Sequence, residues 1–531
     1  MCVCVCVGTG PQAALMASGN WLLVGTSLGA VLLALLLLIT LYSVGDYVHK
    51  WHRLKPIPGV SPTYPILGNA LLFKPKGEDF FLQLLESIDQ FKDEPLMKVW
   101  LGPLPFIVLF HAECVEKILS SSKHLDKSYA YTFLQPWLGT GLLTSTGDKW
   151  RRRRKMLTPA FHFSILTEFL EVMNEQTNIL LEKLEAKAGK GVFNCFNKIT
   201  LCALDIICET AMGKKIHAQE NSESEYIQAI YRMSDLIQRR QKMPWFWLDF
   251  VYNTFGEGKE HNHNLRILHS FTEKVIAERV REMETHVESN HSGFDLDSNS
   301  KSKKKRKAFL DLILSVTDEN GKKLSHQDIR EEVDTIMFEG HDTTAAALNW
   351  TLHLLGSHPN VLKKVHKELD DVFGNSDRAV TMEDLKNLHF LQCVIKESLR
   401  LFPSVPFFAR TLCEDCYIRG FKVPKGVNAI IVPYVLHRDP TYFPEPEEFK
   451  PERFLLENSS KLNPYAFIPF SAGIRNCIGQ RFAIMEEKVI LSTILRRFHV
   501  EAKQCREDLV LMGELILRPQ NGIWIELHRR K

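Results

Sequence analysis

The sequence lacks the excess of positive charge that is typical of nucleic-acid-binding proteins. Its 66 lysines and arginines nearly balance its 63 aspartates and glutamates, which leaves a net charge of +3 over 531 residues. Nucleic acid is therefore not an expected partner, although a local basic patch can still dock an acidic protein. The apolar and charged fractions, 45% and 24%, are those of a globular protein with a large core, in one large or two medium domains.

The sequence also lacks a disulfide framework and a zinc-binding pattern. Its 12 cysteines are scattered without regular pairing, which indicates reduced thiols in a domain that faces the cytosol. Cys413 and Cys416 form a C-x-x-C, but no second Cys or His pair stands at zinc spacing. With Glu414 and Asp415 between them, these two cysteines are expected in a turn.

One stretch is long and apolar enough for a membrane-spanning helix. Residues 22–41 contain no charge, and about 20 helical residues span about 30 Å. No basic residue precedes Trp21, which favours a retained anchor over a cleaved signal peptide. Basic residues follow the stretch, so the positive-inside rule places the rest of the chain in the cytosol. The prolines that come next indicate a stiff linker. The predicted organisation is a short lumenal N-terminus (1–21), a transmembrane anchor (22–44), a basic and proline-rich linker (45–68) and a catalytic domain (69–531).

Apolar residues recur at helical spacing through much of the catalytic domain. Helices are predicted over 150–157, 165–186, 197–212 and 325–355, and short strands over 106–110 and 428–432. Ser325, with Asp328 three residues later, forms a capping box that predicts where the longest helix begins. The sequence therefore predicts a mainly α-helical fold with a minor β-sheet.

The strongest functional signal is the segment Phe470-Ser-Ala-Gly473-Ile-Arg475-Asn-Cys477-Ile-Gly479. A thiolate that ligates haem iron must be held on a tight loop whose backbone amides point at the sulfur. Glycines permit both the turn and the close approach to a porphyrin. The alternative is a buried cysteine in a glycine turn, which does not explain the other constrained positions of the segment.

With this segment the chain resembles the cytochrome P-450 superfamily, whose haem-binding loop has the pattern F-x-x-G-x-R-x-C-x-G. Glu397-Ser-Leu-Arg400 matches the family's E-x-x-R, and Arg453 supplies the third member of its ion-pair network. The resemblance covers essentially everything after the anchor. It implies the cytochrome P-450 fold, haem b with iron ligated axially by Cys477, and monooxygenase activity.

The longest predicted helix carries Phe338-Glu-Gly-His-Asp-Thr-Thr344, which resembles the oxygen-activating segment of the family. A glycine inside a helix and threonines that bond back to the preceding turn let such a segment open locally. Oxygen activation also needs protons delivered to the bound oxygen, and an acid beside an alcohol can relay them from water. The resemblance assigns this proton relay to Asp342 and Thr343. The alternative is an exposed Asp342 with threonines that only pack.

Four residues are expected to bind the haem propionates. Trp150 and Arg154 lie one helical turn apart and match the family's W-x-x-x-R, and Arg475 precedes the ligand by two positions. By resemblance, Arg410 is a further propionate partner.

Glu339 narrows the resemblance to the fatty-acid ω-hydroxylase branch, family 4. Most other branches carry a small residue there, whereas this branch has a glutamate that can form an ester with a haem methyl group. Esterification removes a charge that is costly to bury, and a protonated or water-bonded carboxyl is the alternative. The stretches 202–213 and 464–470 further resemble subfamily V, a microsomal fatty-acid ω-hydroxylase.

The sequence shows no nicotinamide or flavin site of its own. The nearest approach to G-x-G-x-x-G is at Gly139 and Gly141, but its third position is Thr144 and no strand, helix and acidic residue frame it. By resemblance the electrons come from NADPH through the membrane-bound cytochrome P-450 reductase, at the endoplasmic reticulum membrane, with the catalytic domain in the cytosol.

Three hypotheses of function follow. The first is O2-dependent ω-hydroxylation of a fatty acid by an enzyme that is bound to membrane lipid, with the apolar stretches 129–143 and 243–250 lining or covering a long channel. The second is oxidation of another lipid, a steroid or a xenobiotic by the same machinery. The third is a haem sensor without turnover, which has no need of a proton relay.

Overall fold

The computed structural model describes residues 11–221, 224–291, 308–317, 321 and 323–530. It divides the chain into two compact units, Met1–Pro56 and Ile57–Lys531. Residues 1–10, which belong to the predicted lumenal segment, lie outside the described residues.

The first unit contains one long helix, α1 (Pro11–Leu54). Within α1, Ala30–Leu54 is long and apolar enough to cross a membrane, with a mean hydropathy of 2.1. The predicted anchor lies inside α1, but the helix continues through 45–54, so the first part of the predicted linker is helical. No proline interrupts that part, and the helix ends two residues before Pro56, as the loss of an amide donor at proline requires.

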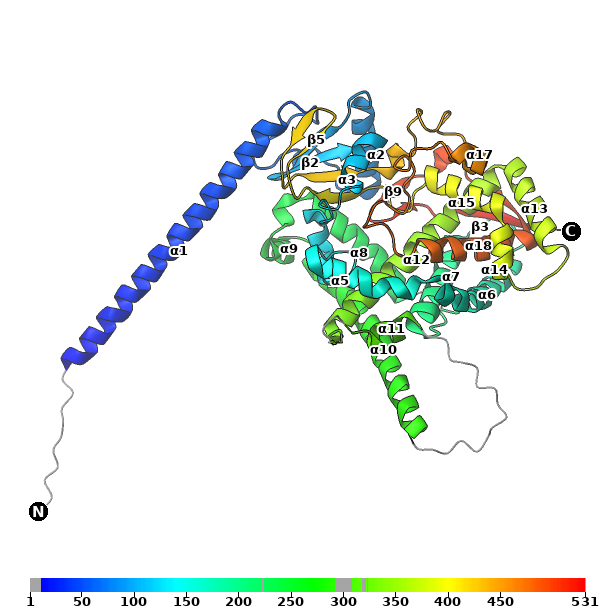
Figure 1. The fold of residues 1–531 in the computed structure, drawn as a ribbon, viewed down its shortest axis with the longest axis horizontal. Helices are drawn as coiled ribbons and strands as arrows, with labels where there is room; N and C mark the ends of the chain where they lie inside the picture. Colours follow the sequence, from blue (N-terminus) through cyan, green and yellow to red (C-terminus); the bar gives the residue numbers. More distant parts are fainter. Residues whose placement is uncertain (1–10, 222–223, 292–307, 318–320, 322, 531) are drawn as a thin grey trace, which may run out of the picture. The chain divides into compact units, whose positions relative to one another are not determined.

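The second unit is mainly helical (Figure 1). Its helices are α2 (Gly77–Gln90), α3 (Ala112–Leu119), α4 (Gln135–Leu138), α5 (Gly147–Leu157), α6 (Phe163–Glu185), α7 (Phe196–Ile207), α8 (Glu225–Lys242), α9 (Asp249–Phe255), α10 (Gly258–His291), α11 (Phe309–Ser315), α12 (His326–Ser357), α13 (Pro359–Phe373), α14 (Met382–Asn387), α15 (His389–Leu401), α16 (Pro433–Leu436), α17 (Leu456–Ser459) and α18 (Gln480–Arg497).

The strands form small sheets. The largest has the order β1 (Met97–Leu101), β2 (Leu104–Leu109), β7 (Asn428–Ile431) and β4 (Phe408–Thr411), with β2 and β7 parallel. The others are β3 (Phe193–Asn194) with β11 (Trp524–Arg529) and β8 (Phe498–Ala502), β5 (Cys416–Ile418) with β6 (Phe421–Val423), and β9 (Leu511–Gly513) with β10 (Leu517–Pro519).

The predicted elements are confirmed, with small shifts of their ends. The predicted helices correspond to α5, α6, α7 and α12, and the predicted strands to β2 and β7. The predicted helix 197–212 changes at Cys208 into a π-helical turn, η4 (Cys208–Met212), which ends at Gly213 with φ 70°. A left-handed residue at that point is the usual way to end a helix.

Helix α12 is the central element of the helical part and contacts α7, α10, α15 and α18 (Figure 1). The predicted capping box begins it: Ser325 Oγ accepts the amide of Asp328 at 3.1 Å, and Asp328 Oδ2 accepts the amide of Ser325 at 3.4 Å. Most residues of α12 are buried, and they occupy all faces of the helix, as expected of a helix that crosses a core.

Candidate active site

The segment 470–479 forms a tight loop that leads into α18. The Cys477 amide donates to the Phe470 carbonyl at 2.9 Å, and the Asn476 amide donates to the Gly473 carbonyl at 3.2 Å. Gly473 has φ +72°, and a Cβ built on it would lie 1.9 Å from the carbonyl oxygen of Leu119 at the end of α3. Only glycine fits this position, because both the backbone conformation and the contact with α3 exclude a side chain.

The sulfur of Cys477 faces a cavity inside the protein. The amides of Gly479 and Gln480, at the start of α18, hydrogen-bond to it, as predicted. The Cys477 side chain is open to the cavity, but desolvation by the surrounding protein raises the pKa of its thiol to about 11. The Glu339 carboxyl raises this pKa further, while the two amides and Arg154 oppose the rise. A cation bound at the sulfur would favour the thiolate, because metal binding displaces the thiol proton.

The cavity has a volume of about 400 Å³ and lies among α2, α5, α8, α12, β4 and the Cys477 loop. Its lining is mostly apolar. It includes seven of the eight predicted site residues: Cys477, Glu339, Thr343, Trp150, Arg154, Arg410 and Arg475. Residues of the stretch 129–143 also line it, as predicted, including Tyr131 and Leu134.

The stretch 243–250 does not line the cavity within the described residues. Three of its large side chains are exposed instead, Trp245 41%, Leu248 69% and Phe250 74%, whereas Met243, Phe246 and Trp247 are partly buried. The channel wall at this point is formed by the preceding turn of α8, because Gln241 and Lys242 face inward.

The arginines predicted to bind propionates are held by backbone oxygens. Arg154 donates to the carbonyl and side-chain oxygens of Asn476 at 2.7 and 2.8 Å, which ties α5 to the Cys477 loop. Arg475 donates to the carbonyls of Leu125 and Ser145 at 2.6 and 2.7 Å, and its guanidinium lies 5.0 Å from the ring of Trp150.

Arg410, on β4, is the least satisfied of these cations. It is 2% exposed, its Nη2 donates to the Arg475 carbonyl at 3.4 Å, and its buried Nη1 has no hydrogen-bond partner in the described chain. A buried guanidinium donor without an acceptor is costly, so this position calls for an anionic group.

Helix α12 brings Glu339 and Thr343 to the cavity. Thr343 Oγ1 donates to the Glu339 carbonyl at 2.6 Å, and Thr344 Oγ1 donates to the Gly340 carbonyl at 3.1 Å, as predicted for these hydroxyls. The helix continues unbroken through this segment. The glycine has a packing role, because a Cβ at Gly340 would lie 2.6 Å from Ile207 of α7.

Glu339 lines the same cavity as Cys477, and its charge acts on the Cys477 thiol. Desolvation raises the pKa of its carboxyl, and the charges of Lys127 and Arg475 partly oppose that rise. The side chain lines the cavity and is not sealed within the core. A carboxyl in this setting is costly to ionise and is available to react with a group bound in the cavity.

Asp342 is the predicted site residue that is absent from the lining. Its carboxylate is 1% exposed and forms a buried ion pair with Arg518 of β10, whose Nε lies 3.3 Å from Asp342 Oδ1. Arg518 Nη1 also lies 3.4 Å from Glu514, which does line the cavity. The alternative of an exposed Asp342 is wrong, because α12 is buried on this face as well.

The predicted ion-pair network behind the Cys477 loop is present. Arg400 Nε lies 2.7 Å from Glu397, and Arg453 Nε lies 3.4 Å from the same carboxylate. Arg400 also donates to the carbonyls of His437 and Pro446, at 3.1 and 2.7 Å. Because both charges of the central pair are buried, removing either partner would leave the other uncompensated.

Comparison with known proteins agrees with this geometry. The family model Cytochrome P-450 matches residues 58–526. The chain is 62% identical to cytochrome P-450 4V2 of Homo sapiens over 497 residues, 94% of each chain. It is 60% identical to cytochrome P-450 4V2 of Rattus norvegicus over 97% of this chain and 98% of that protein, and 48% identical to cytochrome P-450 4c3 of Drosophila melanogaster over 90% of each.

The chain belongs to the cytochrome P-450 family. The names and identities of these relatives also confirm the resemblance to family 4 and its subfamily V. A cytochrome P-450 is a monooxygenase whose haem iron is ligated by a cysteine thiolate, and it takes electrons from NADPH through a reductase.

The residues present in this cytochrome P-450 fit a haem. The cavity offers a thiol with amides directed at its sulfur, and a group of cations that includes one orphaned buried donor, Arg410 Nη1. That is a donor set for a metal porphyrin with two carboxylate substituents.

Sequence reasoning missed two charged residues of the site. Lys127 lines the cavity close to Arg410, Arg475 and Glu339, and burial lowers the pKa of its ammonium well below the ordinary value. Arg518 holds Asp342 from a strand 176 residues further along the chain. Neither Lys127 nor Arg518 belongs to a short sequence motif, so the spacing of neighbouring residues gives no sign that they lie at the site.

Proposed function

We propose that this cytochrome P-450 hydroxylates fatty acids at the ω position, using O2 and electrons from NADPH that a membrane-bound reductase delivers. One observation carries the proposal. The Cys477 sulfur opens into a mostly apolar cavity that Glu339 also lines, and the charge of this carboxyl acts on the thiol. An apolar cavity of this kind suits an unbranched acyl chain.

We propose that Cys477 is the axial ligand and that Trp150, Arg154, Arg410 and Arg475 hold the haem propionates. The orphaned Nη1 of Arg410 supports this assignment, because a propionate oxygen would satisfy it. When bound, the haem supplies the chemistry that activates dioxygen for insertion into a C–H bond. The protein contributes orientation, exclusion of water and delivery of protons.

Asp342 and Thr343 are proposed to deliver those protons. Thr343 presents its hydroxyl from the cavity wall, and its bond to the Glu339 carbonyl fixes the direction in which that hydroxyl accepts. Asp342, the next residue towards the N-terminus, is held by Arg518. A proton that reaches Asp342 passes to Thr343 when the ion pair with Arg518 loosens.

Glu339 is proposed to tether the haem. Glu339 would hold the haem through an ester between its carboxyl group and a haem methyl group, and this bond would fix the macrocycle in the cavity. A tether restricts how far the reacting centre shifts beneath a flexible acyl chain, which favours the terminal methyl over the weaker C–H bond next to it.

The protein is proposed to be anchored in the endoplasmic reticulum membrane by α1, with the catalytic unit in the cytosol. The apolar stretch within α1 supports the anchor. The exposed side chains of Trp245, Leu248, Phe250 and Phe255 support a lipid-facing surface on the catalytic unit, because aromatic residues concentrate at membrane interfaces.

The test is a product assay with purified enzyme, the reductase and NADPH over saturated and unsaturated fatty acids of graded length. The expected result is ω-hydroxy acid, identified by mass spectrometry, in amounts matched to NADPH consumed. A parallel panel of steroids, other lipids and xenobiotics examines the alternative substrates. Turnover confined to that second panel would contradict the proposal, and NADPH consumption without any product would favour a haem sensor.

A further inference from the structure

The cavity wall contains a buried lysine that lies apart from the cations around Cys477. Lys242 ends α8 and is 4% exposed, and its side chain lines the cavity together with Gln238 and Gln241. Its neighbours are Pro75 and Phe80, at the start of α2, whereas Cys477 is surrounded by α5, α12 and α18. The two groups therefore belong to different parts of the lining.

Lys242 has only neutral partners. Its Nζ donates to the Pro75 carbonyl at 3.0 Å and to Gln238 Oε1 at 3.3 Å, and it lies 4.5 Å from the centre of the Phe80 ring. Within the described residues, no ion pair shorter than 4.0 Å joins it to a carboxylate. Burial lowers the pKa of the Lys242 ammonium to about 8.

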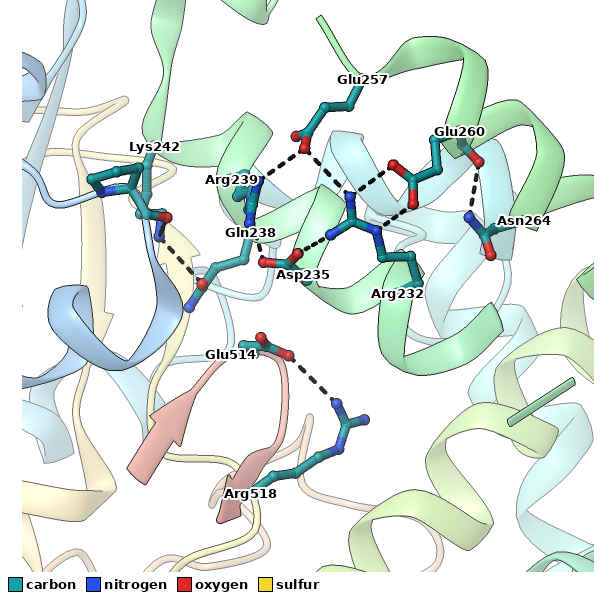
Figure 2. A network of polar contacts seen from close by, with 11 residues as sticks. Arg232, Asp235, Gln238, Arg239, Lys242, Glu257, Glu260, Asn264, Glu514 and Arg518 are labelled. Carbon is teal, nitrogen blue, oxygen red and sulfur yellow. Dashed lines mark hydrogen bonds and ion pairs between the residues drawn. The ribbon is translucent and has the colours of Figure 1, made fainter. Parts of the chain in front are cut away.

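The two carboxylates that act most strongly on Lys242, Asp235 and Glu514, contact arginines, as Figure 2 shows. Asp235 pairs with Arg232 and Arg239, the latter at 3.0 Å, and Glu514 lies 3.4 Å from Arg518. Arg518 is shared between Glu514 and Asp342, and Glu78, which also acts on Lys242 from a distance, accepts from Gln520 at 3.2 Å. None of these carboxylates forms an ion pair with Lys242 itself. A buried cation without a counter-ion is unfavourable, and an anion that enters the cavity would remove that cost.

We propose that Lys242 binds the carboxylate of the fatty acid, with the acyl chain lying along the apolar lining towards Cys477. This inference rests on the proposed function and adds the group that recognises the polar end of the substrate. Gln238 holds the ammonium in place, because its own amide donates to the Gly513 carbonyl and its oxygen accepts from Nζ. Binding the acid at Lys242 leaves the opposite, methyl end of the chain for the reaction.

The experiment compares a fatty acid with its methyl ester, which has the same chain and no charge. Binding of each to the purified holoenzyme is titrated by the change in its absorption spectrum. Wild-type enzyme, Lys242→Met and Lys242→Arg are compared, with Lys123→Met as control, because Lys123 is exposed and outside the lining. Methionine keeps the length of the side chain, and arginine keeps the charge.

The expected result is that Lys242→Met weakens binding of the acid on the order of ten- to hundred-fold, which is the range of a hydrogen bond to a charged group. Binding of the ester should be unchanged, and Lys242→Arg and Lys123→Met should bind the acid nearly as well as wild type. Equal losses for acid and ester would assign Lys242 a structural role only, and an unchanged affinity for the acid would also overturn the inference.

The result is independent of the product assay. If the acid binds through Lys242 but is not hydroxylated at its end, the proposed function fails while the carboxylate site stands. If ω-hydroxy acid forms with undiminished affinity in Lys242→Met, the carboxylate site fails while the proposed function stands.

Discussion

Replacing Gly473 by alanine should destabilise the protein more than the same replacement at Gly147, another glycine with a positive φ. Gly473 and Gly147 have φ +72° and +55°, so alanine suffers a left-handed backbone at both, which costs about 1–2 kcal/mol. At Gly147 a Cβ meets nothing within 4 Å, whereas at Gly473 it would lie 1.9 Å from the Leu119 carbonyl oxygen.

The overlap at Gly473 forces either the loop or the end of α3 to move. Overpacking of this kind adds about 1–3 kcal/mol, so Gly473→Ala should cost roughly 2–5 kcal/mol in total and Gly147→Ala about 1–2 kcal/mol. Because the loop carries Cys477, the damage should appear as lost haem-thiolate as well as lost stability.

The assay measures two quantities for both variants. One is the fraction of protein that gives the thiolate band in the reduced, carbon-monoxide-bound spectrum, and the other is the midpoint of thermal haem loss. Gly473→Ala should be lower than Gly147→Ala in both. Equal values for the two variants would refute the claim that close packing of α3 holds the loop.

Three further predictions concern the reaction and the pH dependence. Thr343→Ala should keep its haem but uncouple NADPH consumption from hydroxylation, with hydrogen peroxide released; unchanged coupling would remove Thr343 from the relay. Acid-solvent extraction should leave part of the haem on wild-type protein and none on Glu339→Ala, whose products should shift towards internal hydroxylation; complete extraction from active wild type would defeat the tether. Burial lowers the pKa of His437 in the folded protein to about 3, whereas its pKa in the unfolded chain is near 6.5. As the pH falls below 6.5 the unfolded chain binds a proton that the folded protein does not, so the free energy of unfolding falls by about 2 kcal/mol on going down to pH 5. Thermal midpoints of His437→Gln should therefore fall less than those of wild type between pH 7 and pH 5, and an equal fall would contradict this assignment.

Local patterns were sufficient to predict several elements of the fold. Apolar residues at helical spacing identified α12, and the reciprocal bonds of Ser325 and Asp328 begin it within one residue of the prediction. These signals are local, because helix periodicity and capping depend on neighbours three or four residues away. The end of the N-terminal helix was missed, since residues 45–54 contain several charged and histidine side chains but no proline to stop the helix.

The site was predictable where its residues stand in short motifs. Cys477, Glu339 and Thr343 were found because each lies at a fixed offset within a recognisable segment, and all three line the cavity. The ion pair between Asp342 and Arg518 was not predictable, since nothing in sequence marks two residues 176 positions apart. Lys242 was missed for the same reason, because its position in the wall depends on how α8 packs beside α2.

The central claim is that Cys477 supplies a thiolate to haem iron, and the reduced, carbon-monoxide-bound absorption spectrum tests it most directly. Wild-type enzyme should give the strongly red-shifted band of a thiolate ligand. Cys505→Ser should give the same band, because Cys505 is exposed and outside the cavity lining. Cys477→His should lose that band even where haem remains bound. A red-shifted band that persists in Cys477→His would contradict the assignment.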